Sequence, residues 1–212
     1  MHIESFIFSP FQENTYVVSD ETKECIIIDP GCYFPEERDA LTSYIKRNGL
    51  KVVKLINTHA HIDHIFGNNF VCKYYNVLPE MHKDELPLLL GAEVSAARFG
   101  LEVSPSPSPE KYIEEGDSIN FGNTSFEVML LPGHAPGHIG LIHREEKVAI
   151  TGDVLFRLSI GRTDLPFCNH NDLIKSIKEK LFLLDDDVVV YNGHGPSTTI
   201  GFEKQNNPFV RN

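Results

Sequence analysis

Three histidines and one aspartate lie within the six residues His59-Ala-His61-Ile-Asp63-His64. They closely follow Val52–Ile56, an apolar and β-branched run that predicts a buried strand. In an extended backbone, His59 and His61 leave the chain on the same face. Imidazole nitrogens and carboxylate oxygens are the ligands that zinc and other borderline divalent metals take. The spacing therefore predicts a metal site, against the alternative of a polar loop whose histidines are merely solvated.

Three further candidate ligands stand in turns rich in glycine and proline. They are His134 in Pro-Gly-His-Ala-Pro, Asp153 in Thr-Gly-Asp, and His194 in Asn-Gly-His-Gly-Pro. Each follows an apolar, strand-like run, so the end of a strand would hold each ligand on a rigid platform, and glycine lets the backbone approach closely. With the first motif, the candidate ligands number seven. One zinc takes three or four protein ligands, so seven predict two metals that share a bridging group.

The series His-x-His-x-Asp-His, Gly-His, Gly-Asp and Gly-His resembles the metallo-β-lactamase superfamily of hydrolases. The stretch from Asp153 through Gly161-Arg-Thr-Asp164 to Asn207-Pro-Phe209 is similar to its single-domain glyoxalase II-like members. The resemblance runs over essentially the whole chain. It implies two ligand sets and a bridge: His59, His61 and His134 for the first metal, Asp63, His64 and His194 for the second, and Asp153 shared by both. The implied cofactors are two divalent ions, zinc first, with iron or manganese as alternatives.

The ligand set predicts a hydrolytic mechanism. A water that bridges two metals becomes hydroxide near neutral pH, because metal binding lowers its pKa from about 15.7 toward about 7. This hydroxide would attack a carbonyl carbon while one metal stabilises the oxyanion, with Asp153 as the bridging ligand and Asp63 as a ligand that can accept a proton. A thiolate leaving group, with a pKa near about 8.5, needs little help from an acid. The expected substrate is therefore a small thioester such as S-lactoylglutathione.

Arg162 is the candidate for binding that substrate. By position it matches a basic residue with which glyoxalase II holds the carboxylate of glutathione, and a structural salt bridge with Asp164 is the alternative. The chain ends shortly after His194. We therefore expect one domain over residues 1–212, without a separate C-terminal glutathione-binding domain, and weak selection for the glutathione portion.

Three other functions stay open. The first is a persulfide dioxygenase of the same fold, which uses one iron held by the equivalents of His59, His134 and Asp153. The second is a β-lactamase, although the Gly161-Arg-Thr-Asp164 stretch favours the glyoxalase II-like members. The third is a non-catalytic metal-binding module, which fits poorly with seven intact ligands.

Other polar residues near the motifs receive separate predictions. Asp29 is a second carboxylate near the metal motif by resemblance, or a turn-forming aspartate. We expect His138 to be buried and hydrogen-bonded beside the ligands, His143 to lie at a strand end on the surface, and His82 to be exposed. Cys168 is more ordinary as a core or surface thiol than as a member of the site.

Hydrophobic periodicity and turn residues predict an α/β protein. Strands are expected at residues 3–8, 14–18, 25–28, 52–56, 77–81, 118–121, 124–131, 139–143, 147–150 and 188–191. Helices are expected at 35–48, 62–75, 84–99, 172–184 and 199–205, and the Ser-Pro repeat at 104–109 predicts a stiff loop. The resemblance, and not the pattern, implies a four-layer αββα sandwich of two mixed sheets with helices outside.

Composition narrows the function classes. The chain of 212 residues carries a net charge of −11, which argues against nucleic acid as a partner. No stretch is typical of a membrane span or a secretory signal, so no membrane partner is expected. The four cysteines lack CxxC spacing and are expected to be reduced thiols in a cytoplasmic protein. The oligomeric state is not predicted.

Overall fold

The computed structural model describes residues 1–211. Two compact units make up the chain: Met1–Ile113 with Asn120–Ser125, and Glu114–Ile119 with Phe126–Asn212. Each unit is built around its own six-stranded sheet with helices, so the α/β class is confirmed. The single domain over residues 1–212 stays a prediction. No helix among residues 1–211 is long and apolar enough to cross a membrane.

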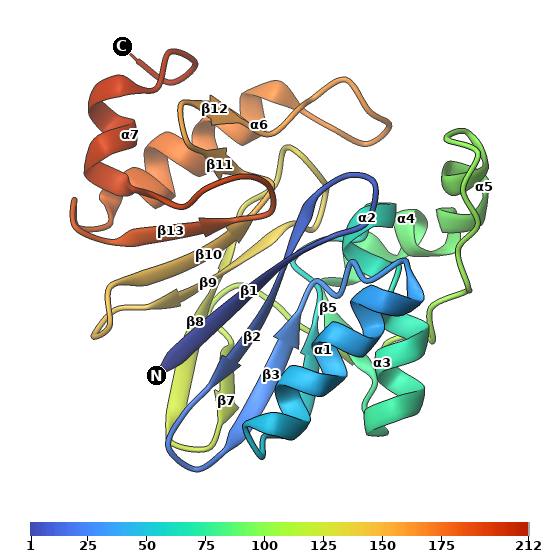
Figure 1. The fold of residues 1–212 in the computed structure, drawn as a ribbon. Helices are drawn as coiled ribbons and strands as arrows, with labels where there is room; N and C mark the ends of the chain where they lie inside the picture. Colours follow the sequence, from blue (N-terminus) through green and yellow to red (C-terminus); the bar gives the residue numbers. More distant parts are fainter. Residues whose placement is uncertain (212) are drawn as a thin grey trace. The chain divides into compact units, whose positions relative to one another are not determined.

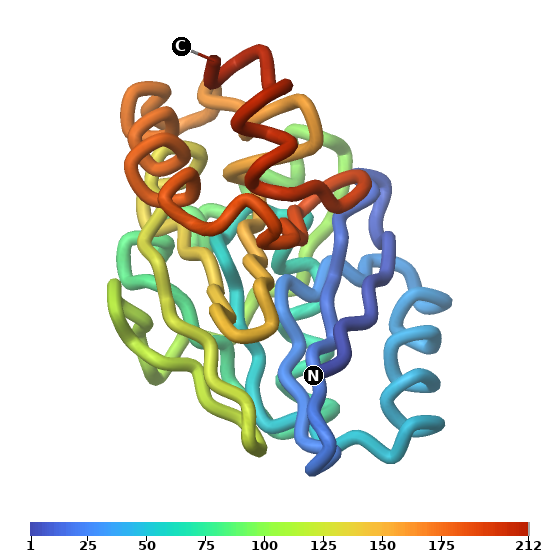
Figure 2. The backbone as a smooth tube through the Cα atoms, turned by 90° about the vertical axis from the view of Figure 1, so that its left-hand side faces the viewer, coloured from blue at the N-terminus to red at the C-terminus, as the bar shows by residue number. Residues whose placement is uncertain are grey.

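The sheet of the first unit has the strand order β1-β2-β3-β4-β5-β6 (Figure 1). The strands are β1 (His2–Phe8), β2 (Glu13–Ser19), β3 (Glu24–Ile28), β4 (Lys51–Ile56), β5 (Pro79–Met81) and β6 (Lys111–Tyr112). The first three are antiparallel, and β3 to β6 run parallel, so this sheet is mixed. In Figure 2, β1 and β2 form the dark blue hairpin beside the lighter blue helix α1.

The helices of the first unit are α1 (Pro35–Arg47), α2 (Ile62–Ile65), α3 (Asn68–Tyr75), α4 (Leu86–Leu90) and α5 (Ala92–Ala97). Helix α1 starts at a proline, and the Glu37 carboxylate accepts the backbone N–H groups of Tyr33 and Phe34 just before it. Its apolar stripe and that of α3 pack on one face of the sheet. The buried residues of this cluster include Val17, Ile27 and Leu55 from strands, Leu41 and Ile45 from α1, and Val71 from α3.

The sheet of the second unit has the order β14-β13-β10-β9-β8-β7. Its strands are β7 (Ser118–Phe121), β8 (Thr124–Leu130), β9 (Ile139–His143), β10 (Val148–Gly152), β13 (Val189–Asn192) and β14 (Thr198–Thr199). Strands β10 and β13 are parallel, while β8–β9, β9–β10 and β13–β14 are antiparallel. A separate small hairpin joins β11 (Leu155–Phe156) and β12 (Ser159–Ile160).

Two helices belong to the second unit, α6 (His170–Lys175) and α7 (Ile200–Asn206). The Asn169 side chain caps α6, because it accepts the backbone N–H groups of Asn171 and Asp172. After α6 the chain continues as a π-helical turn, Ser176–Lys180, and a 3₁₀ turn, Leu181–Leu183. Leu173, Ile177 and Leu181 pack in one buried cluster with the strand residues Met129, Ile142 and Ala149.

The structure differs from the sequence predictions mainly at helix interruptions. The predicted helix 62–75 is broken at Gly67, whose N–H donates to the carbonyl of Pro30 at 2.7 Å. A side chain at Gly67 would come within 2.4 Å of the Cys32 sulfur, so this close crossing requires glycine. The predicted helix 84–99 is divided at Gly91. The two-residue strands β6, β11, β12 and β14 carry too short a pattern to be predicted.

Candidate metal centre

The His-x-His-x-Asp-His motif lies directly after β4, where α2 begins, as the sequence predicts. The His59 and His64 side chains are fully buried, and their ring centroids are 4.1 Å apart. The His61 ring lies 4.8 Å from that of His59, edge to face. Asp63 Oδ2 lies 3.9 Å from Nε2 of His64. The first unit therefore brings all four predicted ligands of this motif together.

Asp29 orients two of these histidines, His64 directly and His59 through the Thr58 hydroxyl. Its Oδ2 lies 3.0 Å from Nδ1 of His64 and accepts the hydroxyl proton of Thr58 at 2.5 Å. The Thr58 oxygen in turn lies 3.1 Å from Nδ1 of His59. Because the single hydroxyl proton is donated to Asp29, this oxygen accepts a hydrogen bond from Nδ1–H of the His59 ring. Asp29 thus has the supporting position that the resemblance implies, and its φ of 48° shows that it also forms the turn.

The hydrogen bonds of Asp29 and Thr58 determine which ring nitrogens of His59 and His64 can bind a metal. Both His59 and His64 carry their ring proton on Nδ1, so each presents the lone pair of Nε2 to a ligand. A carboxylate oxygen of Asp29 and one ring nitrogen each of His59 and His64 lie within 4.8 Å of one another. Imidazoles whose other nitrogen donates to a carboxylate or hydroxyl are typical metal ligands. The donor set of the first unit therefore fits a divalent metal of the zinc type.

A second buried carboxylate lies beside this network. The Glu13 side chain is fully buried, with Oε1 3.9 Å from Nδ1 of His64, and Oε2 bonded to the Thr15 hydroxyl at 2.8 Å. Burial raises the pKa of the Glu13 carboxyl well above its ordinary value, and the charge of His64 opposes this shift. Sequence reasoning did not single out Glu13.

The backbone of the motif is held by another residue that sequence reasoning missed. Glu85 is fully buried, and its carboxylate accepts the N–H of Ala60 at 2.8 Å. Ala60 stands between the two histidines His59 and His61, so this hydrogen bond restrains the segment that carries both rings. In the sequence, Glu85 is only an acidic residue in the first turn of a predicted helix, where a negative charge ordinarily stabilises the helix N-terminus.

The second unit brings together its own three predicted ligands. His134 Nε2 and His194 Nε2 each lie 3.5 Å from the same oxygen, Oδ2 of Asp153. Asp153 follows β10 and His194 follows β13, and these are the neighbouring parallel strands of the sheet. The carboxyl ends of parallel strands meet at one edge, so the two residues are delivered side by side. His134 and Asp153 are buried, and His194 is partly exposed.

Hydrogen bonds hold the His134 ring and the backbone of Asp153 in place. Nδ1 of His134 lies 2.9 Å from the carbonyl of Arg162, so that nitrogen carries the proton and Nε2 faces Asp153. The buried Nε2 of His138 accepts the N–H of Asp153 at 3.1 Å, which confirms His138 as a buried supporting residue. A Cβ at Gly161 would lie 2.0 Å from the carbonyl oxygen of Asp153, so only glycine permits this close approach.

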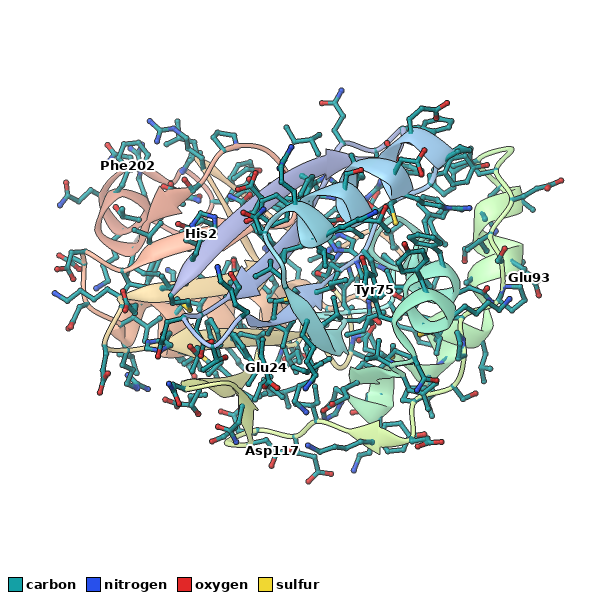
Figure 3. All side chains as sticks on the ribbon, turned by 60° about the horizontal axis from the view of Figure 1, so that its bottom comes forward. His2, Glu24, Tyr75, Glu93, Asp117 and Phe202 are labelled. Atoms are coloured by element: carbon teal, nitrogen blue, oxygen red, sulfur yellow. The ribbon has the colours of Figure 1, made fainter. Side chains whose placement is uncertain are left out.

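Other polar residues near the motifs have the following contacts. Arg162 forms a bidentate ion pair with Asp164, at 2.7 and 2.8 Å, so the structural alternative is realised. Arg157 packs its guanidinium over the ring of Phe202, which Figure 3 labels on α7. His143 lies half-buried at the end of β9. Cys168 is partly exposed, and its sulfur contacts the carbonyl of His134 at 2.8 Å.

The prediction that His82 is exposed is wrong. Its side chain is buried, and its Nδ1 accepts the N–H of Asp84 at the start of a 3₁₀ turn. The imidazole acts as a helix cap, which lets a polar ring be buried with its nitrogen satisfied. The sequence around His82 showed no second ligand, and that observation did not anticipate a capping role.

The comparisons with known proteins identify the family. The model of the metallo-beta-lactamase superfamily matches residues 8–194. Hydroxyacylglutathione hydrolase GloC of Haemophilus influenzae is 39% identical over 213 residues, which cover 99% of this chain and 98% of that protein. The probable metallo-hydrolase YqgX of Bacillus subtilis is 36% identical, with 95% and 93% covered.

Solved structures give the same family. The B3 metallo-beta-lactamase BLEG-1 superposes with a TM-score of 0.92 at 34% identity, and all of both chains is covered. TTHA1623, solved in a di-iron-bound form, has a TM-score of 0.88 at 36% identity, with 97% and 99% covered. ETHE1 from Myxococcus xanthus has a TM-score of 0.79 at 26% identity, with 98% of this chain and 84% of ETHE1 covered.

The chain belongs to the metallo-β-lactamase superfamily and has the metallo-β-lactamase fold, with two mixed sheets and helices. More particularly, it is a metallo-hydrolase of that superfamily. The superfamily binds a dinuclear metal site, and each of the two units contains a histidine-rich group with the required donor chemistry. The identity of the metal is a separate matter, because TTHA1623 was solved with iron.

Proposed function

We propose that this protein is a glyoxalase II-like hydrolase that cleaves small acyl thioesters such as S-lactoylglutathione. The observation that carries the proposal is the match to hydroxyacylglutathione hydrolase GloC, which extends over nearly the whole of both chains. We propose further that His59, His61, Asp63, His64, His134, Asp153 and His194 form one dinuclear centre, with Asp153 as the shared ligand. The ion is zinc in this proposal, and the location cytoplasmic.

The chain's own residues have defined tasks in this reaction. When bound, two divalent ions supply a water acidified enough to act as a nucleophile and polarise the substrate carbonyl. Asp29 and Thr58 keep protons on Nδ1 of His64 and His59, so both rings present Nε2 without reorganisation. Asp63, the partly exposed carboxylate of the motif, accepts the proton that the attacking water gives up. The thiolate leaves unprotonated, because its pKa is near about 8.5.

The test is hydrolysis of S-lactoylglutathione, followed as loss of the thioester absorbance. Wild-type protein loaded with zinc should hydrolyse the thioester in the absence of oxygen. Asp153→Ala should lose most of its metal and activity, while His143→Ala, a half-buried histidine at a strand end, should keep both. Thioester hydrolysis that is absent from zinc-, iron- and manganese-loaded protein contradicts the proposal.

A second candidate function is the mononuclear-iron persulfide dioxygenase, which the similarity to ETHE1 favours. A dioxygenase leaves the second set of ligands unused, so His64→Ala and His194→Ala would reduce its activity only slightly. In a dinuclear hydrolase the same substitutions would reduce the activity severely. Oxygen uptake with glutathione persulfide, at a rate insensitive to His194→Ala, would select this candidate. Because the chain is similar to BLEG-1, β-lactam hydrolysis should be measured as well, with a chromogenic cephalosporin as the substrate.

A further inference from the structure

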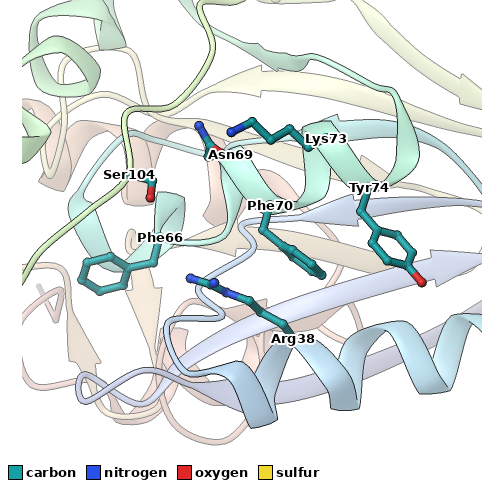
Figure 4. Close-up of a pocket in the computed structure, with 7 residues that line it drawn as sticks. All are labelled: Arg38, Phe66, Asn69, Phe70, Lys73, Tyr74 and Ser104. Carbon is teal, nitrogen blue, oxygen red and sulfur yellow. The ribbon is translucent and has the colours of Figure 1, made fainter.

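A cleft of about 350 Å³ lies in the first unit, outside the histidine motif (Figure 4). Its lining comes from α1, from the segment Phe66–Tyr74 that includes α3, and from the start of the Ser-Pro segment at Ser104. The seven lining residues are Arg38, Phe66, Asn69, Phe70, Lys73, Tyr74 and Ser104. Small-molecule sites are typically concave, lined by aromatic groups and a few polar ones, and begin at about 300 Å³.

The charge of this lining is opposite to that of the protein. The chain has a net charge of −11, yet the cleft is lined by two cations and by no acidic residue. Among residues 1–211, neither Arg38 nor Lys73 forms an ion pair with a carboxylate. Two cations without acidic partners in a concave surface favour an anionic ligand.

Arg38 is held in position before any ligand arrives. Its Nη2 donates to the carbonyl of Tyr33 at 3.1 Å and its Nε to that of Cys32 at 3.4 Å. Its guanidinium carbon lies 5.6 Å from the centre of the Phe70 ring, and Figure 4 shows the Arg38 side chain extending from α1 below Phe70. A guanidinium has five N–H donors, so these two contacts leave donors for an anion in a fixed place.

The aromatic residues add a second requirement on the ligand. Phe70 and Tyr74 lie one turn apart on α3, with ring centroids 5.5 Å apart. The Tyr74 side chain is 62% exposed, although aromatic rings ordinarily bury most of their surface. Asn69 donates to the carbonyl of Pro105 at 2.7 Å, which fastens the Ser-Pro segment at the rim of the cleft. A fixed cation by the Phe70 ring, with the exposed Tyr74 ring next to Phe70, favours a ligand that is both planar and charged.

We propose that this cleft binds a small aromatic anion, with its ring against Phe70 and Tyr74 and its acidic group on Arg38 and Lys73. The site is separate from the metal ligands, so the proposal goes beyond the proposed function. Phosphate esters and carboxylates of aromatic rings share the required chemistry, and a phosphate ester offers the larger charge.

Phenyl phosphate, titrated calorimetrically into the full-length protein at low salt, tests this site. It should bind saturably and at least about tenfold more tightly than inorganic phosphate, which has the charge without the ring. Lys73→Gln should weaken phenyl phosphate about fivefold, while Lys46→Gln, an exposed lysine on α1 outside the cleft, should leave it unchanged. Phe70→Leu should reduce the affinity to that of inorganic phosphate.

Arg38→Gln should abolish binding, and circular dichroism checks that the variant folds, because Arg38 also bonds backbone carbonyls. Asp153→Ala tests whether phenyl phosphate binds at the metal ligands instead of the cleft. Phenyl phosphate should bind this variant with the affinity that it has for the wild type. Binding that is lost in Asp153→Ala but kept in Lys73→Gln would place the phosphate on the metals and overturn the proposal. The absence of saturable binding to wild-type protein, or equal effects of Lys73→Gln and Lys46→Gln, would overturn it as well.

Discussion

The carboxylate oxygen Oδ2 of Asp29 lies 3.0 Å from Nδ1 of His64. The two residues are 35 positions apart in the chain, and both side chains are buried. A buried carboxylate that accepts from one imidazole nitrogen determines which nitrogen has the lone pair. Through the Thr58 hydroxyl, the same oxygen also determines the tautomer of His59. One aspartate that is not a proposed ligand therefore prepares two of the proposed ligands.

Asp29→Asn should weaken metal binding by about 10- to 100-fold. Both carboxylate oxygens of Asp29 accept hydrogen bonds, whereas an amide accepts only at its one oxygen, so the rings of His59 and His64 would be held less firmly. Competition with a chelator measures this change in affinity. Asp84→Asn is the matched control, since Asp84 is exposed and its carboxylate lies 3.6 Å from the capping His82, away from the histidine motif in sequence. An Asp29→Asn protein with the metal affinity of the wild type would contradict the role of this network.

The cysteines should differ sharply in reactivity. Burial raises the pKa of the Cys25 and Cys32 thiols to about 12 and that of Cys72 to about 11. At pH 8 the thiolate fraction of the first two is only about 10⁻⁴, so alkylation of the native protein should mark Cys168, the partly exposed one. Mass spectrometry after iodoacetamide treatment reads out the positions. Labelling of Cys32 as fast as of Cys168 would show that the loop after β3 opens readily.

Glu13 should make the stability of the metal-free protein depend on pH. Its pKa in the folded protein is raised, so its contribution is fully present below the ordinary value of 4.5 and is lost as pH rises toward the raised value. Between pH 5 and pH 8, the wild type should therefore lose more stability in denaturant unfolding than Glu13→Gln, which cannot ionise. Glu93→Gln, at the surface in Figure 3, is the control and should match the wild type. Parallel pH profiles for all three proteins would refute this prediction.

Arg162 should give only modest selection for glutathione thioesters. Its guanidinium is already paired with Asp164, and both side chains are more than half exposed, so a further charged contact there is weak. We expect the wild type to prefer S-lactoylglutathione over the same acyl group on a short thiol by roughly tenfold to a hundredfold. Arg162→Ala should erase this preference, chiefly through KM, while Arg157→Ala keeps it. A preference of several thousandfold would mean that another part of the chain binds glutathione.

The proposed metal ligands were the most predictable part of the candidate site. His59, Asp153 and His194 each follow an apolar strand, and the end of a strand is where the chain can present a polar group from a rigid frame. Within each unit, the structure indeed brings the predicted ligands together. The assignment of ligands to two ions came from the resemblance, because spacing alone does not say which side chains share a metal.

The residues that support the ligands could not be predicted in the same way. Glu13 and Glu85 reach His64 and Ala60 only because distant segments cross in the fold, at separations that no local pattern encodes. The interruption at Gly67 has the same origin, since it depends on the approach of Pro30 from another loop. His82 was mispredicted because a capping histidine and a solvated one look alike in sequence.

A zinc titration tests whether the protein is a dinuclear thioester hydrolase, as we propose. Metal-free protein receives zinc in fractions of an equivalent, without oxygen, and hydrolysis of S-lactoylglutathione is measured at each step. Activity should keep rising beyond one equivalent of zinc and reach its plateau at two, since seven ligands exceed what one ion takes. Full activity at one equivalent, or no hydrolysis with both equivalents bound, would contradict the proposal.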